Sequence, residues 1–209
     1  MSTTPAGPVP ASDPVPDAAA PLAEDGTQPG PRRRLGPWVF ALAAVVLAAD
    51  QLSKWWALSA LTEGGAPISL VGELLQLRLV FNPGAAFSIA TGMTWVLTII
   101  VVVVVVVIVR AVRRIGSRGW AVALGLLLGG ALGNLGDRLF RDPGFAQGHV
   151  VDFIDYAGFF VGNVADIAIV AAAILIALLS VRGIALDGTR HTDDAEPEAT
   201  SAGTDTEGR

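Results

Sequence analysis

Four long apolar stretches alternate with polar segments along this 209-residue chain. They cover about residues 38–58, 93–109, 119–136 and 163–181. A helix needs roughly 20 apolar residues to cross a bilayer, and the shortest stretch reaches about 26 Å at the ~1.5 Å helical rise per residue. The pattern therefore predicts an all-α membrane protein built as a four-transmembrane-helix bundle.

The loop over residues 59–92 follows a different pattern. Leucines alternate with polar residues over positions 75–79, which is the period of a strand, and the turn signal Asn82-Pro83-Gly84 follows. We expect a small β-cradle on the membrane surface here. Asn82 taken alone is explained by the turn, because an asparagine amide can bond to its own backbone.

Both ends of the chain are polar and lack apolar periodicity. Residues 1–36 are rich in Pro, Ala and Asp, and residues 184–209 carry seven acids and two arginines. Such segments bury too little surface to offset their ordering entropy, so we predict two disordered tails around a membrane domain at 37–183. The first span continues through Trp55 and Trp56 without a small-residue cleavage site, which favours an uncleaved span over a signal peptide.

Arginines indicate the orientation of the spans. They flank one set of span ends, at 32–34, 110–118 and 182, whereas the two opposite loops, 59–92 and 137–162, are poor in them. The positive-inside rule then places both tails in the cytoplasm and both loops outside. The strand-like loop and the polar residues at the margins of the last two spans would share the extracytoplasmic side.

Ionisable residues gather at that margin. Asp152 precedes the fourth span and Asp166 lies one turn inside it, while Asp50 and Lys54 stand four residues apart in the first span and can pair. Charges at membrane depth are costly and suggest a site. Each also has a structural explanation: Lys54 can snorkel to the interface, Asp166 can complement the helix dipole, and Asp152 can be a polar position on a strand.

Two neighbouring carboxylates suit amide hydrolysis, because one stays protonated while the other acts as a base. The sequence disfavours thiol catalysis and zinc hydrolysis, because the chain has no cysteine, only two histidines and no HExxH motif. No phosphate loop or basic aromatic patch indicates a nucleotide or nucleic-acid partner. A small transporter and a structural scaffold remain as alternatives, although the valine-rich second span carries no polar path.

Five motifs give the chain a resemblance to the lipoprotein signal peptidase (signal peptidase II) family over roughly residues 38–183. They are Asp50-Gln51-Leu52-Ser53-Lys54, Asn82-Pro83-Gly84-Ala85-Ala86-Phe87, Gly133-Asn134-Leu135-Gly136-Asp137-Arg138, Val150-Val151-Asp152-Phe153 and Asn163-Val164-Ala165-Asp166.

The resemblance implies an aspartyl endopeptidase that cuts diacylglyceryl-modified prolipoproteins before the lipidated cysteine, with Asp152 and Asp166 as the catalytic dyad. Supporting or substrate-binding roles would fall to Asp50, Lys54, Asn82, Gly84, Asn134, Asp137, Arg138, Asn163 and Ala165. We expect no metal or organic cofactor and no nucleic acid. The protein would be a monomer among the lipids of a bacterial cytoplasmic membrane, with its site at the extracytoplasmic face.

Overall fold

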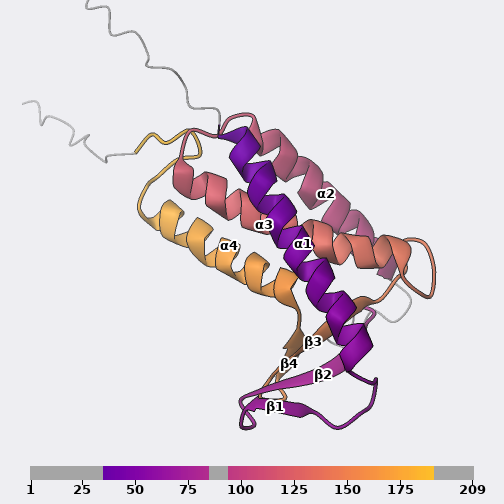
Figure 1. The fold of residues 1–209 in the computed structure, drawn as a ribbon. Coiled ribbons are helices and arrows are strands. Elements are labelled where there is room, and N and C mark those ends of the chain that lie inside the picture. The colour runs from indigo at the N-terminus through magenta and orange to yellow at the C-terminus, as the bar shows by residue number, and fades with distance from the viewer. Residues whose placement is uncertain (1–34, 85–93, 191–209) are drawn as a thin grey trace, which may run out of the picture. The chain divides into compact units, whose positions relative to one another are not determined.

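The structure is a computed structural model that describes residues 35–84 and 94–190 (Figure 1). Most of both predicted disordered tails lies outside these residues, as do Ala85, Ala86 and Phe87 of the second motif. Residues 184–190 are an exception. They were expected to belong to a disordered tail, but they form a hydrogen-bonded hairpin in which Ile184 pairs with Arg190.

Four helices account for the apolar stretches. They are α1 (Gly36–Ala60), α2 (Thr94–Val112), α3 (Arg118–Phe140) and α4 (Val164–Val181). Each is long and apolar enough to cross a membrane, which confirms the prediction of four such helices. The third helix continues four residues beyond the predicted end at 136, so Asp137 and Arg138 lie on α3 and not in a loop.

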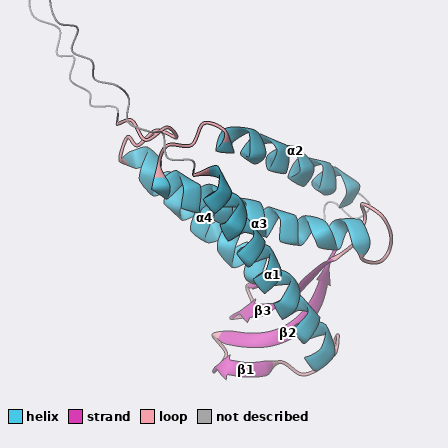
Figure 2. Ribbon diagram, turned by 45° about the horizontal axis from the view of Figure 1, so that its top comes forward, coloured by secondary structure: helices cyan, strands magenta, loops and turns pink. Residues whose placement is uncertain are grey.

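A four-stranded antiparallel sheet joins the two inter-helix loops at the C-terminal end of α1 (Figures 1 and 2). Its strands follow the order β1 (Ile68–Val71), β2 (Leu75–Asn82), β3 (Val150–Tyr156) and β4 (Phe160–Gly162). The pairing of β2 with β3 sets Val80 opposite Asp152 and Asn82 opposite Val150. Directly opposed residues point to the same face, so Asp152 shares a face with Val80. Asn82 lies two residues after Val80 and therefore points to that face too.

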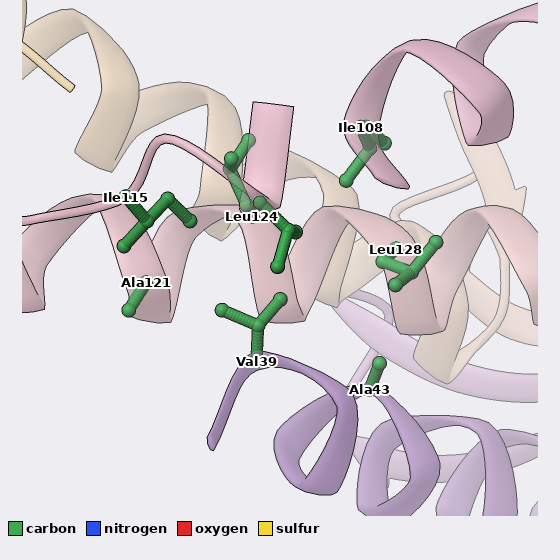
Figure 3. Packing of buried hydrophobic residues seen from close by; sticks show 8 residues of the cluster. Val39, Ala43, Ile108, Ile115, Ala121, Leu124 and Leu128 are labelled. Atoms are coloured by element: carbon green, nitrogen blue, oxygen red, sulfur yellow. The ribbon is translucent and has the colours of Figure 1, made fainter. Parts of the chain in front are cut away.

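The helix α3 is the central member of the bundle. In the apolar stretch of α3, 56% of the residues are buried inside the protein, against 22% for α1, 17% for α2 and 22% for α4. Apolar side chains of α1, α2 and α3 interlock around Val39, Ile108 and Leu124 (Figure 3). The exposed faces of the other three helices remain rich in Val, Ile and Leu, as expected where lipid takes the place of protein.

Small residues on α3 decide how close the neighbouring helices come. A side chain at Gly129 would collide with Val46 and the carbonyl of Ala43 on α1, and one at Gly133 would collide with the Asp50 carboxylate. Glycines at helix contacts permit such close approach of backbones. They bring the polar residues of α1 against α3 at the sheet end of the bundle.

Candidate active site

A buried ammonium joins two of the carboxylates. The Nζ atom of Lys54 lies 2.8 Å from Asp50 Oδ2 and 2.7 Å from Asp137 Oδ2, and none of the three side chains is more than 1% exposed. The predicted pairing of Asp50 with Lys54 is therefore confirmed. The alternative that the Lys54 side chain snorkels to the membrane interface is wrong, because this side chain is fully buried. The side chain turns into the bundle because a second carboxylate on the extended α3 receives it there.

The same carboxylates fasten four elements to one another. Asp137 accepts hydrogen bonds from Arg141 Nε at 2.6 Å and from the backbone N–H of Val151, on β3, at 3.2 Å. Asp50 accepts one from the backbone N–H of Ala165, on α4, at 3.0 Å. Arg141 was missed by sequence reasoning. Its spacing of four residues from Asp137 would have pointed to it had α3 been extended that far.

Asn134 carries the network from the lysine to the second pair of carboxylates. Its Oδ1 accepts from Lys54 Nζ at 3.0 Å and from Asn163 Nδ2 at 3.2 Å, and its Nδ2 donates to Asp166 Oδ1 at 2.9 Å. An ammonium can only donate, so Lys54 dictates which way the Asn134 amide points. The amide N–H group is thereby aimed at Asp166.

Asn163 holds both remaining carboxylates. Its Nδ2 donates to Asp152 Oδ1 at 2.7 Å, and its backbone N–H donates to Asp166 Oδ2 at 3.1 Å. Its Oδ1 accepts from the Asp166 backbone at 3.1 Å, which closes a capping box at the start of α4, as the sequence indicated. Asp152 and Asp166 thus converge on one asparagine.

Asn82 acts both as a turn residue and as a partner of the site. Its Oδ1 accepts from the Gly84 backbone at 2.7 Å, which is the turn interpretation, while its Nδ2 donates to Asp152 Oδ2 at 2.8 Å. Gly84 has φ +97°, and a side chain there would meet Leu97 and the Arg138 guanidinium. Only glycine fits such a position without strain.

Neutral amides are the recorded side-chain partners of Asp152 and Asp166, since none of the ion pairs among the described residues includes either carboxylate. Asp152 is 2% exposed. The pKa of Asp152 is raised to about 6, chiefly by burial and also by the neighbouring charge of Asp166, while the hydrogen bonds from Asn82 and Asn163 oppose the rise. A buried carboxyl with such a pKa can exchange a proton near neutral pH.

Arg138 has hydrogen-bond donors without a partner close to these carboxylates. Its side chain is buried, and its Nε and Nη1 atoms have no hydrogen-bond partner within residues 35–84 and 94–190. Its charge interacts electrostatically with Asp137, Asp152 and Asp166. Buried N–H groups without a partner are rare in folded proteins, which makes Arg138 a candidate for binding an acceptor from another molecule.

Comparisons with known proteins fit this geometry. A family model described as signal peptidase (SPase) II matches residues 42–182. The chain belongs to the signal peptidase II family. As a member of a peptidase family it is an enzyme, which decides against the transporter and scaffold interpretations.

Relatives in this family span most of the chain. A lipoprotein signal peptidase of Rhodococcus jostii is 52% identical over 152 residues, covering 73% of this chain and 76% of the relative. One of Mycobacterium tuberculosis is 46% identical over 167 residues, covering 79% and 82%. Two solved structures, both of a bacterial membrane enzyme obtained by the in meso method, match with TM-scores of 0.64 and 0.62 at 25% and 27% identity. They cover 78% and 70% of this chain, and 94% of each solved chain.

The eleven residues that the sequence singled out for this signal peptidase II site lie together in the structure. Ten of them are linked by hydrogen bonds or ion pairs, and Arg138 lies where a side chain at Gly84 would meet its guanidinium. Their catalytic and supporting roles stay predictions. Within the described ranges, no group of three or more His, Cys, Asp or Glu side chains is placed to hold a metal ion. A hollow of about 650 Å³ beside the site is lined by Phe81, Phe140, Arg141 and His149, but not by Asp152 or Asp166.

Proposed function

We propose that this chain is an intramembrane aspartyl endopeptidase that removes the signal peptide from diacylglyceryl-modified prolipoproteins, cleaving before the lipidated cysteine. One observation carries the proposal: Asp152 and Asp166, from different elements, meet on Asn163 with neutral amides as their side-chain partners. The substrate follows from the relatives, which are named lipoprotein signal peptidases.

The two carboxylates would divide the chemistry between them. Two acids this close resist double ionisation, so the pair retains one proton and one negative charge. The ionised carboxylate takes a proton from a water molecule, whose oxygen attacks the scissile carbonyl carbon, while the protonated carboxyl donates to the carbonyl oxygen. Breaking of the C–N bond then returns a proton to the departing amine. Asn82, Asn134 and Asn163 hold the carboxylates in place during these transfers.

Arg138 would position the substrate. Its unpartnered N–H groups are buried, and the guanidinium lies beside Gly84, where a side chain would approach it. Substrate backbone carbonyls are suitable acceptors for these donors, because an arginine presents several N–H groups in a fixed plane. This contact would hold the peptide extended across the site. Asp50, Lys54, Asp137 and Ala165 would act more remotely, by fixing Asn134 and the start of α4.

The aromatic residues of α1 support the proposed place in a bacterial cytoplasmic membrane. Trp38 near its start and Trp55 and Trp56 near its end are all exposed, and the first and last stand about 27 Å apart along the helix. Tryptophans favour the two interfaces of a bilayer. With the arginine-rich ends inside, both termini are cytoplasmic, and the sheet and the dyad face the extracytoplasmic side. All site groups come from one chain, which favours a monomer that contacts membrane lipids.

The test is cleavage of a diacylglyceryl prolipoprotein by the purified full chain in the presence of a chelator, read as a mobility shift on a gel. Asp152→Asn and Asp166→Asn are assayed beside the wild type, together with the same prolipoprotein before lipidation. We expect the wild type to cut only the lipidated substrate and the variants to cut neither. An intact lipidated substrate after incubation with well-folded wild type would contradict the peptidase assignment.

A further inference from the structure

The end of the bundle opposite the sheet is held together by the C-terminal hairpin, residues 184–190. The backbone N–H groups of Gly116 and Ser117, in the turn between α2 and α3, donate to the Leu186 carbonyl at 3.0 and 3.3 Å. Trp120 Nε1 donates to the Ile184 carbonyl at 2.8 Å. A side chain at Gly116 would collide with the backbone of Asp187. The hairpin therefore seats on the α2–α3 turn.

This seating joins arginines from three separate segments into one arginine surface. The α2–α3 region contributes four, the end of α4 contributes one and the hairpin adds the last. All six are exposed. The members of the arginine surface are Arg110, Arg113, Arg114, Arg118, Arg182 and Arg190.

Positive charge is in excess on this surface within the described part of the chain. The ion pairs there involve Lys54, Arg78 and Arg141, at the sheet end, and none of the six arginines. Residues 110–118 and 182–190 contain six arginines and one acid, Asp187, which leaves a net charge of +5 in these segments. Six like charges repel one another unless counter-charges gather on them.

The position of the surface decides which counter-charges are available. The arginines lie where the apolar runs of α2, α3 and α4 end, so in a membrane they reach the depth of the lipid head groups. Guanidinium groups bind phosphate in a bidentate manner, and clusters of basic residues next to a span attract anionic lipids. We propose that the arginine surface binds the head groups of anionic phospholipids. It shares no residue with the carboxylate site, so this binding is separate from peptidase activity.

The experiment is native mass spectrometry of the full chain released from micelles that contain equal amounts of phosphatidylglycerol and phosphatidylethanolamine with the same acyl chains. We expect the wild type to retain the anionic lipid about fivefold more than the zwitterionic one. The triple variant Arg113→Gln, Arg114→Gln, Arg118→Gln should lose most of that preference. The matched triple exchange to lysine keeps the charge and should keep most of the preference.

Two further variants separate the surface from the fold and from catalysis. Arg182→Gln with Arg190→Gln leaves the α2–α3 turn intact and should lower the preference about twofold. Asp166→Asn should retain the full preference whether or not the protein cleaves prolipoproteins. Equal retention of both lipids by the wild type, or an unchanged preference in the triple glutamine variant, overturns the proposal. Displacement by inorganic phosphate at matched ionic strength would also overturn it, because a lipid would then not be required.

Discussion

Two pairs of carboxylates lie in one hydrogen-bond network, and the two pairs differ in the groups that bind them. Asp50 and Asp137 share the ammonium of Lys54, whereas Asp152 and Asp166 share the neutral Asn163. The first pair has its charge compensated and joins α1, α3, β3 and α4. The second pair forms no ion pair among the described residues, and under the proposed mechanism it exchanges a proton with the substrate. Asp50, Asp137 and Asp152 are all buried and Asp166 is partly exposed, so the partner and not burial alone makes the difference.

The strongest way to test this contrast is to remove one carboxylate of the amide-held pair. Asp166→Asn should lower the rate of prolipoprotein cleavage by about 10³-fold or more, because general acid–base catalysis contributes about 10²–10⁴-fold. The fold should persist, since Asn163 still caps α4 through its own side chain. Cleavage is measured on the gel and folding by thermal unfolding in detergent. A variant that cleaves at a tenth of the wild-type rate would argue against a catalytic Asp166.

The complementary change removes the cation of the other pair. Lys54→Met leaves Asp50 and Asp137 buried without their ammonium, and breaking a buried ion pair in this way costs about 3–5 kcal/mol of stability. We expect a marked loss of thermal stability in detergent. Ser53→Ala, on the same helix turn, removes a hydroxyl that bonds only its own helix backbone and serves as the control. Wild-type stability in Lys54→Met would show that the network does not depend on this charge.

The connection between the two pairs is broken by Asn134→Leu, which keeps the approximate volume but removes the hydrogen bonds with Lys54, Asn163 and Asp166. A hydrogen bond to a charged group contributes about 1.5–3 kcal/mol, so the cleavage rate should fall about 10- to 100-fold. The loss should appear in kcat with little change in KM, since the residue positions Asp166. A change confined to KM would instead indicate that Asn134 contacts the substrate.

The remaining prediction concerns the pH dependence of stability. The pKa of Asp152 is about 6 in the fold and 3.8 in its ordinary state, so the folded protein binds the proton more tightly. The carboxylate therefore reduces stability as pH rises from about 4 to 6, by up to about 3 kcal/mol, and no further above that range. Unfolding temperatures of the wild type and Asp152→Asn are compared from pH 4 to 8. Parallel curves would contradict the raised pKa.

The sequence predicted the helices well because their apolar runs are long, but it misplaced one boundary. The polar residues Asp137 and Arg138 interrupt the apolar run of the third span and suggested that the helix ends before them. The helix continues because Lys54 and Arg141 compensate Asp137. This compensation depends on side chains far away along the chain, which no local pattern reveals.

Long-range contacts explain the other differences. The alternation of residues around 75–79 predicted a strand, but nothing in the sequence predicted that β2 pairs with β3, some 70 residues later. The hairpin at 184–190 was assigned to a disordered tail by its composition, and it is seated by backbone bonds to the turn before α3. The site residues were found through their motifs, while Arg141, which lies outside those motifs, was missed.

The distribution of the site along the chain has a consequence for its synthesis. Asp50 bonds to Ala165, 115 residues later, and Asp166 belongs to the last helix. A ribosome-bound chain that has delivered only three helices lacks one of the two proposed catalytic acids and the asparagine that joins them. Under the proposed mechanism such a chain is inert. Peptidase activity would then begin only when α4 enters the membrane, so that proteolysis is coupled to the insertion of this helix.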